Sequence, residues 1–305
     1  MEDVTMVDPI SSKLELTAAR RRFTGEPHRL LLAMMQAGED IRTVPDASTE
    51  QADLEAEVFL QVCKAGGFSP HPAGIINVRP RSAMQLAIRL VSEPYIVRHW
   101  AERLLPQHYP DIAPDPVDQF NGVPGVRYQT TSGAVRLYRP GHDAEIRLTG
   151  FPTRWWNRMA TAVGQTELAA EADWTSLERS VHTSRCLYDS DDTRLASPLL
   201  RRIRVTVGSG TVNATEAWTS GHSLRVETTD GPPCEQLVDG LRTSPGWQLE
   251  RGCCNCGSAS RVGCGLDFRV PRTGQVVDYS NLRWQRTVDQ RCRDRIAEMN
   301  GQAFA

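Results

Sequence analysis

Hydrophobic residues recur at helical spacing through the first part of the chain. Near the end of this segment three of them follow one another at four-residue steps, Leu54, Val58 and Val62. Ser48 stands three residues before Gln51, which is the spacing of a capping box. Thr24 lies three residues before Pro27 and is a second candidate helix cap. The pattern therefore predicts helices over residues 11–66.

The segment from about 70 to 165 mixes helical and strand-like periodicity. Apolar residues alternate with polar ones over residues 84–90, which indicates a half-buried strand. A helix is expected to begin at Pro94, with Ser92 as its cap. Three further strands are expected, near 125–130, 134–139 and 143–149. A last helix carries two tryptophans that we expect in the core, Trp155 and Trp156.

The remainder of the chain is predicted to be richer in strands. They are expected near 202–207, 211–218, 223–228, 247–251 and 266–270. A helix around 234–242 separates the third of these strands from the fourth. This order of strands and helix is similar to that expected for part of residues 70–165, but the amino-acid residues at corresponding positions do not match. The sequence alone therefore does not establish an internal repeat.

These elements predict an α+β protein. The expected organisation is an N-terminal helical segment over 1–67, followed by two mixed units over 68–165 and 166–305. Both units should contain mainly antiparallel sheets with packed helices, because short turns join neighbouring strands. The second unit carries a cysteine-rich loop.

The composition is that of a globular protein, with 40% hydrophobic and 24% charged residues in a chain of 305. A formal net charge of −2 gives no general argument for nucleic-acid or membrane binding. Only two of the 35 basic residues are lysines, Lys13 and Lys64, and this dominance of arginine is typical of a GC-rich bacterial genome. The longest strongly apolar run, Leu30 to Met35, is too short to span a bilayer. Because residues 1–16 also lack the features of a secretory signal, we expect a cytoplasmic protein.

Half of the eight cysteines fall within one Gly/Ser-rich stretch, residues 253–264. Cys253 and Cys256 have the Cys-x-x-Cys spacing that presents two thiolates to one zinc ion. Cys264 would supply the third ligand, and the fourth is assigned to Cys292. In a reducing cytoplasm such a group favours metal over disulfides. The sequence therefore predicts a structural zinc knuckle.

Other interpretations of this loop stay open. Cys254, Cys234 and His222 are further candidates for the fourth ligand, and adjacent Cys253 and Cys254 do not easily face the same ion. Inert thiols are one alternative to metal binding. An iron–sulfur cluster and a redox-active pair are two more, although the chain has neither a ferredoxin-type spacing nor a thioredoxin-like frame.

A cluster of aspartates is the second concentration of reactive groups. It consists of Asp189, Asp191 and Asp192. Carboxylates at this spacing either bind a hard cation such as Mg²⁺ or raise one another's pKa so that one acts as a general acid. The competing interpretation is structural: a loop in which Asp192 or Thr193 caps a helix over 194–201.

The string Asp-Ser-Asp-Asp-Thr over 189–193 is similar to the Asp-x-Asp-Asp-Thr motif of class II terpene cyclases. That resemblance implies that the middle aspartate, Asp191, protonates an alkene or epoxide. It covers only these residues. Arg194 stands where the family usually has a small residue, and the flanking sequence is strand-like rather than helical.

The C-terminal region is the most basic part of the chain. Four of its arginines are the predicted nucleic-acid contacts, Arg283, Arg286, Arg291 and Arg293. A solvated helix with local acidic partners would explain them equally well. The leading prediction is a non-enzymatic binding or assembly protein with a zinc knuckle, whose partner is nucleic acid or another protein. The alternative is a metal-dependent or acid-catalysing enzyme that uses the aspartate cluster.

Overall fold

The computed structural model describes most of the chain between Pro9 and Leu282. The described residues are 9–41, 44–64, 69–110, 112–115, 117–163, 168, 171–188, 195–208, 215–220, 223–229, 231–232, 234–242, 247, 250–254, 263–269 and 276–282. From residue 250 onward the description is limited to the backbone.

Three helices form the N-terminal segment: α1 (Pro9–Thr24), α2 (His28–Gln36) and α3 (Thr49–Val62). The predicted helical segment is confirmed, and so is the cap of α3, where Ser48 Oγ accepts a 3.3 Å hydrogen bond from the Gln51 amide. The prediction that Thr24 caps the second helix is wrong. Its hydroxyl donates instead to the Arg20 carbonyl inside α1, at 3.0 Å, and α2 begins at His28 without a side-chain cap.

Five strands form the first sheet: β1 (Ile75–Ser82), β2 (Gln85–Leu90), β5 (Arg127–Thr131), β6 (Ala134–Tyr138) and β7 (Glu145–Thr149). Their order is β1-β2-β7-β6-β5, with β2 and β7 parallel and the other neighbours antiparallel. The accompanying elements are η1 (Pro72–Gly74), α4 (Pro94–Leu104), β3 (Gln107–His108), β4 (Phe120–Asn121) and α5 (Thr153–Ala162). Pro94 opens α4 as predicted, but its N-cap residue is Glu93 rather than Ser92.

The second sheet also has five strands: β8 (Thr215–Ser220), β9 (Ser223–Thr229), β10 (Glu250–Cys254), β11 (Gly263–Arg269) and β12 (Val276–Leu282). It is preceded by α7 (Ser176–Tyr188), α8 (Ala196–Leu200) and η3 (Ile203–Thr206), and α9 (Cys234–Arg242) lies between β9 and β10. The strand expected near 202–207 is thus a 3₁₀ helix. Ile203 and Val205 alternate as in a strand, but this segment contacts α1 and α9 and belongs to neither sheet.

The two sheets have the same strand order. Sheet 2 is ordered β8-β9-β12-β11-β10, which matches β1-β2-β7-β6-β5 strand for strand. In each sheet the second and fifth strands along the chain form the parallel pair, β2 with β7 and β9 with β12. A helix joins the second strand to the third in both, α4 in one and α9 in the other. The chain therefore contains two units of one topology, which residue matching did not reveal.

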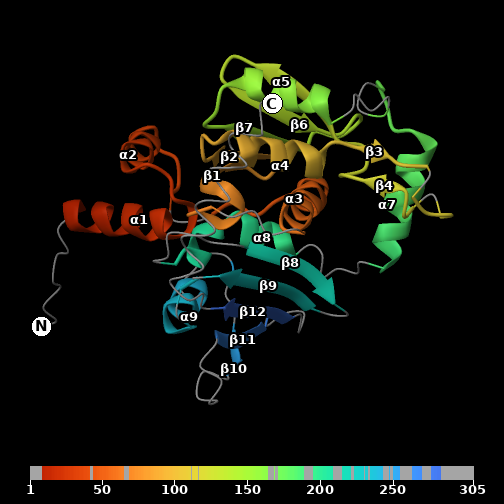
Figure 1. Cartoon of the computed structure of the whole chain (residues 1–305). Helices are drawn as coiled ribbons and strands as arrows, with labels where there is room; N and C mark the ends of the chain where they lie inside the picture. The colour runs from red at the N-terminus through yellow and green to blue at the C-terminus, as the bar shows by residue number, and fades with distance from the viewer. Residues whose placement is uncertain are drawn as a thin grey trace, which may run out of the picture.

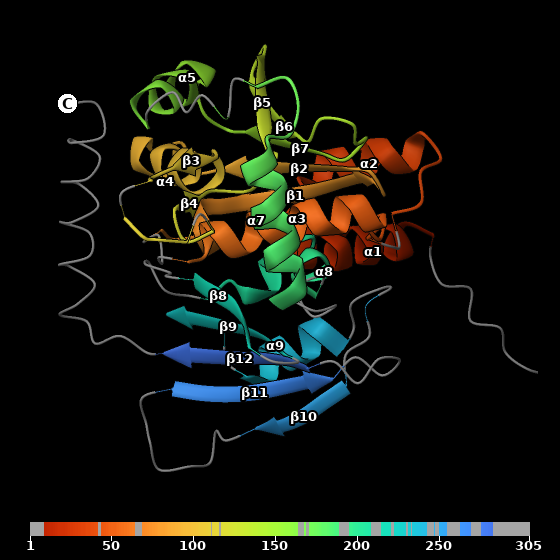
Figure 2. The same cartoon turned by 90° about the vertical axis from the view of Figure 1, so that its right-hand side faces the viewer.

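Helix α3 lies between the sheets (Figure 1) and packs against α8. One hydrophobic cluster extends from Ile88 of the first sheet through Phe59 of α3 to Leu224 of the second. In the first unit, α4 and α5 lie together on one side of the sheet (Figure 2), and Trp156 of α5 is fully buried. The predicted α+β class, with an N-terminal helical segment and mainly antiparallel sheets, is confirmed. No helix in the described ranges is both long and apolar enough to cross a bilayer.

Candidate ligand-binding pocket

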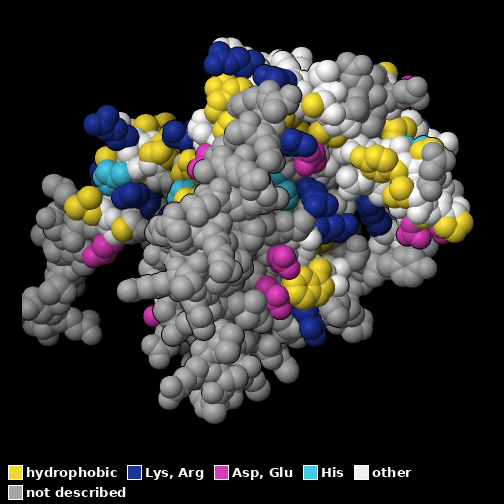
Figure 3. Space-filling model, viewed as in Figure 1, with side chains coloured by type: hydrophobic (Ala, Val, Ile, Leu, Met, Phe, Trp, Pro, Cys, Tyr) yellow, Lys and Arg dark blue, Asp and Glu magenta, His cyan; other side chains and the backbone are white. Residues whose placement is uncertain are grey.

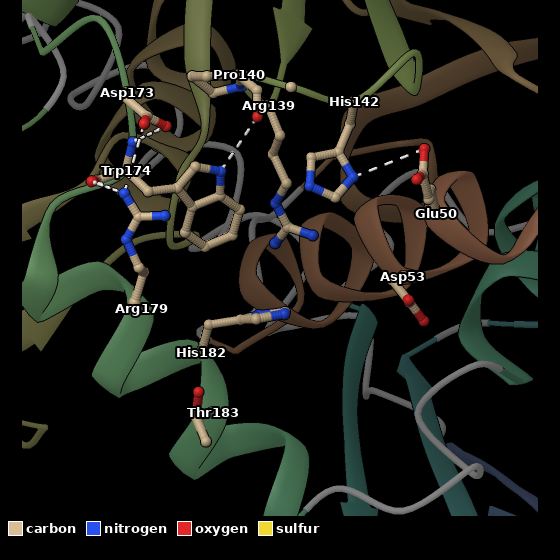
Figure 4. A pocket seen from close by; sticks show the side chains of 11 residues that line it. Glu50, Asp53, Arg139, Pro140, His142, Asp173, Trp174, Arg179, His182 and Thr183 are labelled. Atoms are coloured by element: carbon tan, nitrogen blue, oxygen red, sulfur yellow. Dashed lines mark hydrogen bonds and ion pairs between the residues drawn. The ribbon is translucent and has the colours of Figure 1, made fainter.

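A cavity of about 520 Å³ opens between α3, the turn that joins β6 to β7, and the N-terminal part of α7. This volume lies in the range of sites for small molecules. Figure 4 shows side chains from all three elements pointing toward one another around it. Those that matter most for its chemistry are Glu50, Arg139, His142, Trp174 and His182.

Helix α7 is held in place by a capping box and a buried ion pair. Thr175 Oγ1 accepts a 3.2 Å hydrogen bond from the Glu178 amide, and Glu178 Oε2 accepts one of 2.9 Å from the Thr175 amide. The Glu178 carboxylate also receives two hydrogen bonds from Arg127 of β5, at 2.8 and 3.0 Å. Both side chains are buried. His182 follows Glu178 by one helical turn, so this anchor fixes its position.

The carboxylate of Glu178 is stabilised as an anion. Burial alone would raise its pKa, but hydrogen bonds from Arg127 and from the Thr175 and Gly125 amides outweigh burial and lower the pKa. Gly125 has no side chain, which allows the Trp174 ring of the pocket wall to pack against its backbone. Its φ is +72°, and a β-carbon there would lie 2.5 Å from the ring of Trp174. Trp174 is thus packed closely against the backbone of the first unit.

Arg139 lies at the inner end of the pocket and is only 4% exposed. Its Nε donates to the Pro124 carbonyl at 3.1 Å, and its Nη2 donates to Glu57 Oε1 at 2.8 Å. The guanidinium lies over the Trp174 ring, 5.3 Å from the ring centroid, in a cation–π arrangement. These contacts fix the guanidinium while it still faces the cavity (Figure 4).

His182 shares the carboxylate that holds Arg139. Its Nδ1 lies 3.2 Å from Glu57 Oε1, and its ring meets the edge of Trp174 at 5.3 Å between centroids. Burial raises the pKa of Glu57, but Arg139 and His182 have the larger combined effect, and the pKa falls from 4.5 to about 2. Glu57 is therefore ionised at neutral pH and orients both nitrogen groups toward the pocket.

The α3 wall of the pocket, which also carries Glu57, is acidic. Glu50 and Asp53 lie one turn apart on α3, and both line the cavity. His142 from the β6–β7 turn approaches this wall, with Nδ1 at 3.6 Å from Glu50 Oε2. The described lining of the pocket thus has two carboxylates on α3, while the turn and the α7 segment supply two imidazoles, the guanidinium of Arg139 and the exposed pair of Arg179 with Asp173. Such a site can bind an anionic group and a cationic group of the same ligand.

Most of the predicted site residues fall outside the described part of the chain. This holds for the aspartate cluster (Asp189, Asp191 and Asp192), for two of the predicted zinc ligands (Cys256 and Cys292) and for the four arginines (Arg283, Arg286, Arg291 and Arg293). Those assignments stay predictions. Within the described residues, no three His, Cys, Asp or Glu side chains are grouped closely enough to hold a metal ion.

The backbone places the remaining predicted zinc ligands in one hairpin. Cys253 and Cys254 end β10, and Cys264 is the second residue of β11. The two strands are antiparallel, and Cys254 pairs with Leu266, two positions from Cys264. The hairpin therefore brings both ends of the cysteine-rich stretch to the same end of the sheet.

The pocket was not predicted from the sequence. Its residues come from three distant segments, and each histidine stands alone in the chain. One local signal was present, the Thr175-x-x-Glu178 capping box, which marks the start of α7. No protein-family model matches the chain, and neither a curated protein nor a solved structure matches it. The chemistry of the pocket is therefore the main evidence for function.

Proposed function

We propose that the protein is a non-enzymatic binding protein whose pocket takes a small dipolar ligand, with an anionic group such as a carboxylate and a cationic amine. The observation that carries this proposal is the fixed guanidinium of Arg139, which is held by Glu57 of α3 and lines the same cavity as Glu50 and Asp53 from the preceding turns of that helix. Free α-amino acids have this charge arrangement and are small enough for a cavity of about 520 Å³.

Preorganised charges favour such a ligand. Arg139 is already ordered by Pro124 and Glu57, so binding costs little side-chain entropy at this position. A guanidinium matches the geometry of a carboxylate, and the two imidazoles add donors beside it. The ammonium group of the ligand would face Glu50. The carboxylates of the pocket balance its cations. A ligand that carries only a negative charge therefore gains less binding free energy than a ligand with both charges.

The proposal is tested by thermal denaturation with a panel of α-amino acids and with matched acids and amines that carry one charge. We expect at least one amino acid to raise the melting temperature more than its one-charge analogues do. His142→Gln should abolish the shift. Asp143→Asn is the matched control, because Asp143 is exposed in the same turn but does not line the pocket, and it should keep the shift. Equal shifts in both variants, or no shift with any compound, would exclude this function.

A structural zinc site in the β10–β11 hairpin is the second candidate function. The observation that favours it is the pairing of Cys254 with Leu266, which places β10 residues 253–254 beside the start of β11 at Cys264. Cys256 and Cys292 remain the proposed further ligands. A cytoplasmic location would keep these thiols reduced and available to a metal.

Metal analysis of the purified protein tests the zinc proposal. We expect one zinc per chain, loss of that zinc with Cys256→Ser, and a lower melting temperature after chelation. Cys63→Ala is the control, because Cys63 is buried beside α3 and should affect stability without changing the zinc content. A chain free of zinc and insensitive to chelation would contradict this proposal without affecting the pocket.

A further inference from the structure

One face of the first sheet carries five arginines. Directly paired residues lie on the same face of a sheet, and the pairing of β1, β2, β7 and β6 aligns four residues in one row: Arg79, Ala87, Arg147 and Arg136. Arg89 lies two positions beyond Ala87 and shares this face. Arg81 at the end of β1 interacts electrostatically with Arg79 and Arg147. We name this surface the arginine face, formed by Arg79, Arg81, Arg89, Arg136 and Arg147.

The other face of the same sheet belongs to the core. Its residues alternate with the arginines along each strand and are fully buried: Val78, Leu86, Ile88, Val135, Leu137, Ile146 and Leu148. Tyr128 pairs with Leu137 on that side and contacts Trp156 of α5, with 6.0 Å between ring centroids. Helices α4 and α5 lie together on one side of the sheet in Figure 2. The arginine face is the side turned away from Trp156 and the core.

The arginine face is open to solvent and strongly positive. Arg136 and Arg147 are 35% and 39% exposed, and Arg81 and Arg89 are exposed. One carboxylate on this face, Glu145, forms ion pairs with Arg136 at 2.5 Å and with Arg147 at 2.7 Å. Within the described part of the chain, no direct ion pair neutralises the other three arginines, Arg79, Arg81 and Arg89.

The like charges on this face oppose one another in the free protein. Arg147 lies directly opposite Arg136 on the neighbouring strand, an arrangement that is unfavourable for like charges. Although most of Arg81 is exposed, partial burial of its side chain, and then the proximity of Arg79 and Arg147, lowers the pKa of Arg81. Glu145 bridges Arg136 and Arg147 and offsets their repulsion, so the repulsion falls mainly on Arg81 beside Arg79 and Arg147. A ligand with regularly spaced negative charges would relieve that repulsion.

We propose that the arginine face binds the phosphate backbone of single-stranded nucleic acid. Neighbouring strands lie about 4.8 Å apart, so the row from β1 to β6 spans roughly 14 Å. That distance corresponds to about four nucleotides of a stacked strand at about 3.4 Å each. The proposal concerns a surface separate from the pocket, and its outcome does not depend on the pocket ligand.

Two features favour a single strand over a duplex. A row of this length on a sheet face is too broad to enter a major groove, which is about 12 Å wide. Tyr138 lies on the arginine face, and the Arg136 guanidinium lies over its ring at 4.7 Å from the centroid. Aromatic rings and guanidinium planes of this kind stack on unpaired bases. The phosphates would meet the arginines while a base stacks beside Tyr138.

Fluorescence anisotropy with a labelled oligouridine tests the proposal, with a duplex of the same length as competitor. We expect the single strand to bind and the duplex to compete poorly, with affinity falling as salt rises from about 50 to 200 mM. The double variant Arg81→Gln/Arg89→Gln should weaken binding several-fold. It should also reduce the slope of log K against log salt by about 1.4, since each phosphate contact contributes about 0.7.

The matched control is Arg98→Gln/Arg103→Gln, which removes the same charge from α4. It should leave binding unchanged. Equal weakening by the two double variants, or no binding by the wild-type protein, would overturn the proposal.

The same variants also test whether a second copy of the chain, and not nucleic acid, occupies the arginine face. Sheet 2 carries Glu216 opposite Glu227, and acidic side chains lie over β8 and β9 in Figure 3. Salt-sensitive self-association that is lost in Arg81→Gln/Arg89→Gln, without nucleic-acid binding, would assign the arginine face to protein assembly and overturn our proposal.

Discussion

Arg127 of β5 and Glu178 of α7 form a two-bond ion pair, with only 3% and 0% of their side chains exposed. It joins the sheet of the first unit to the helix that carries His182. Removing one partner of a buried pair leaves an uncompensated charge, so we expect Arg127→Met to lower the free energy of unfolding by about 3–5 kcal/mol. Urea denaturation measures this. The exposed pair Arg179–Asp173 is the control, and Arg179→Gln should have almost no effect.

The depressed pKa of Glu57 predicts a specific dependence of stability on pH. A carboxylate whose pKa is lowered by folding stabilises the protein above its unfolded pKa, and this contribution is lost as the pH falls through the folded pKa. For Glu57 the window runs from 4.5 down to about 2. We expect Glu57→Gln to be less stable than wild type at pH 7 and to approach it near pH 2. A difference that does not change with pH would contradict the contacts that Glu57 forms with Arg139 and His182.

The close approach of Gly125 to Trp174 predicts an unequal response to two glycine substitutions. Gly125 and Gly133 both have positive φ, +72° and +82°, so an alanine at either site costs about 1 kcal/mol in backbone strain. Only at Gly125 would the new methyl group also displace the Trp174 ring, since nothing lies within 4 Å at Gly133. We therefore expect Gly125→Ala to be the more destabilising variant by urea denaturation and to impair ligand binding. Equal effects would mean that Trp174 is not packed as described.

Two serines with similar sequence context should differ in their contribution to stability. Ser48 caps α3 through the Gln51 amide, whereas Ser92 precedes the N-cap residue of α4 and forms no cap. We expect Ser48→Ala to cost about 1 kcal/mol and Ser92→Ala to stay within about 0.5 kcal/mol of wild type. Thermal unfolding of the two variants provides the comparison. A larger loss of stability for Ser92→Ala than for Ser48→Ala would mean that Ser92 caps α4, as the sequence predicted.

Local patterns predicted most of the individual elements. Helix α9 occupies Cys234–Arg242, the expected range, and strands β5 to β7 lie within about two residues of their expected positions. These elements have strong periodicity and clear turn residues. Errors arose where a residue had two possible local partners. Thr24 is an example, because its hydroxyl bonds backward to Arg20 inside α1.

The relationships between distant segments were not accessible to sequence patterns. The shared strand order of the two sheets depends on which strands pair, and β2 pairs with β7 across more than fifty intervening residues. The pocket also depends on contacts between distant segments, because Glu57, Arg139 and His182 meet only after the chain has folded. The arginine face was hidden for a further reason. Its charges are spaced along four strands, so no single segment appears basic.

The most direct test of the proposed function is an NMR titration with tryptophan indole ¹⁵N labelling. The chain has seven tryptophans, and among those that the structure describes Trp174 lines the pocket, where its indole N–H donates to the Pro140 carbonyl at 3.3 Å. We predict that the α-amino acid selected by thermal denaturation shifts the Trp174 indole signal to saturation and leaves that of Trp218, exposed on sheet 2, unchanged. A saturating ligand that leaves the Trp174 signal in place would contradict the account.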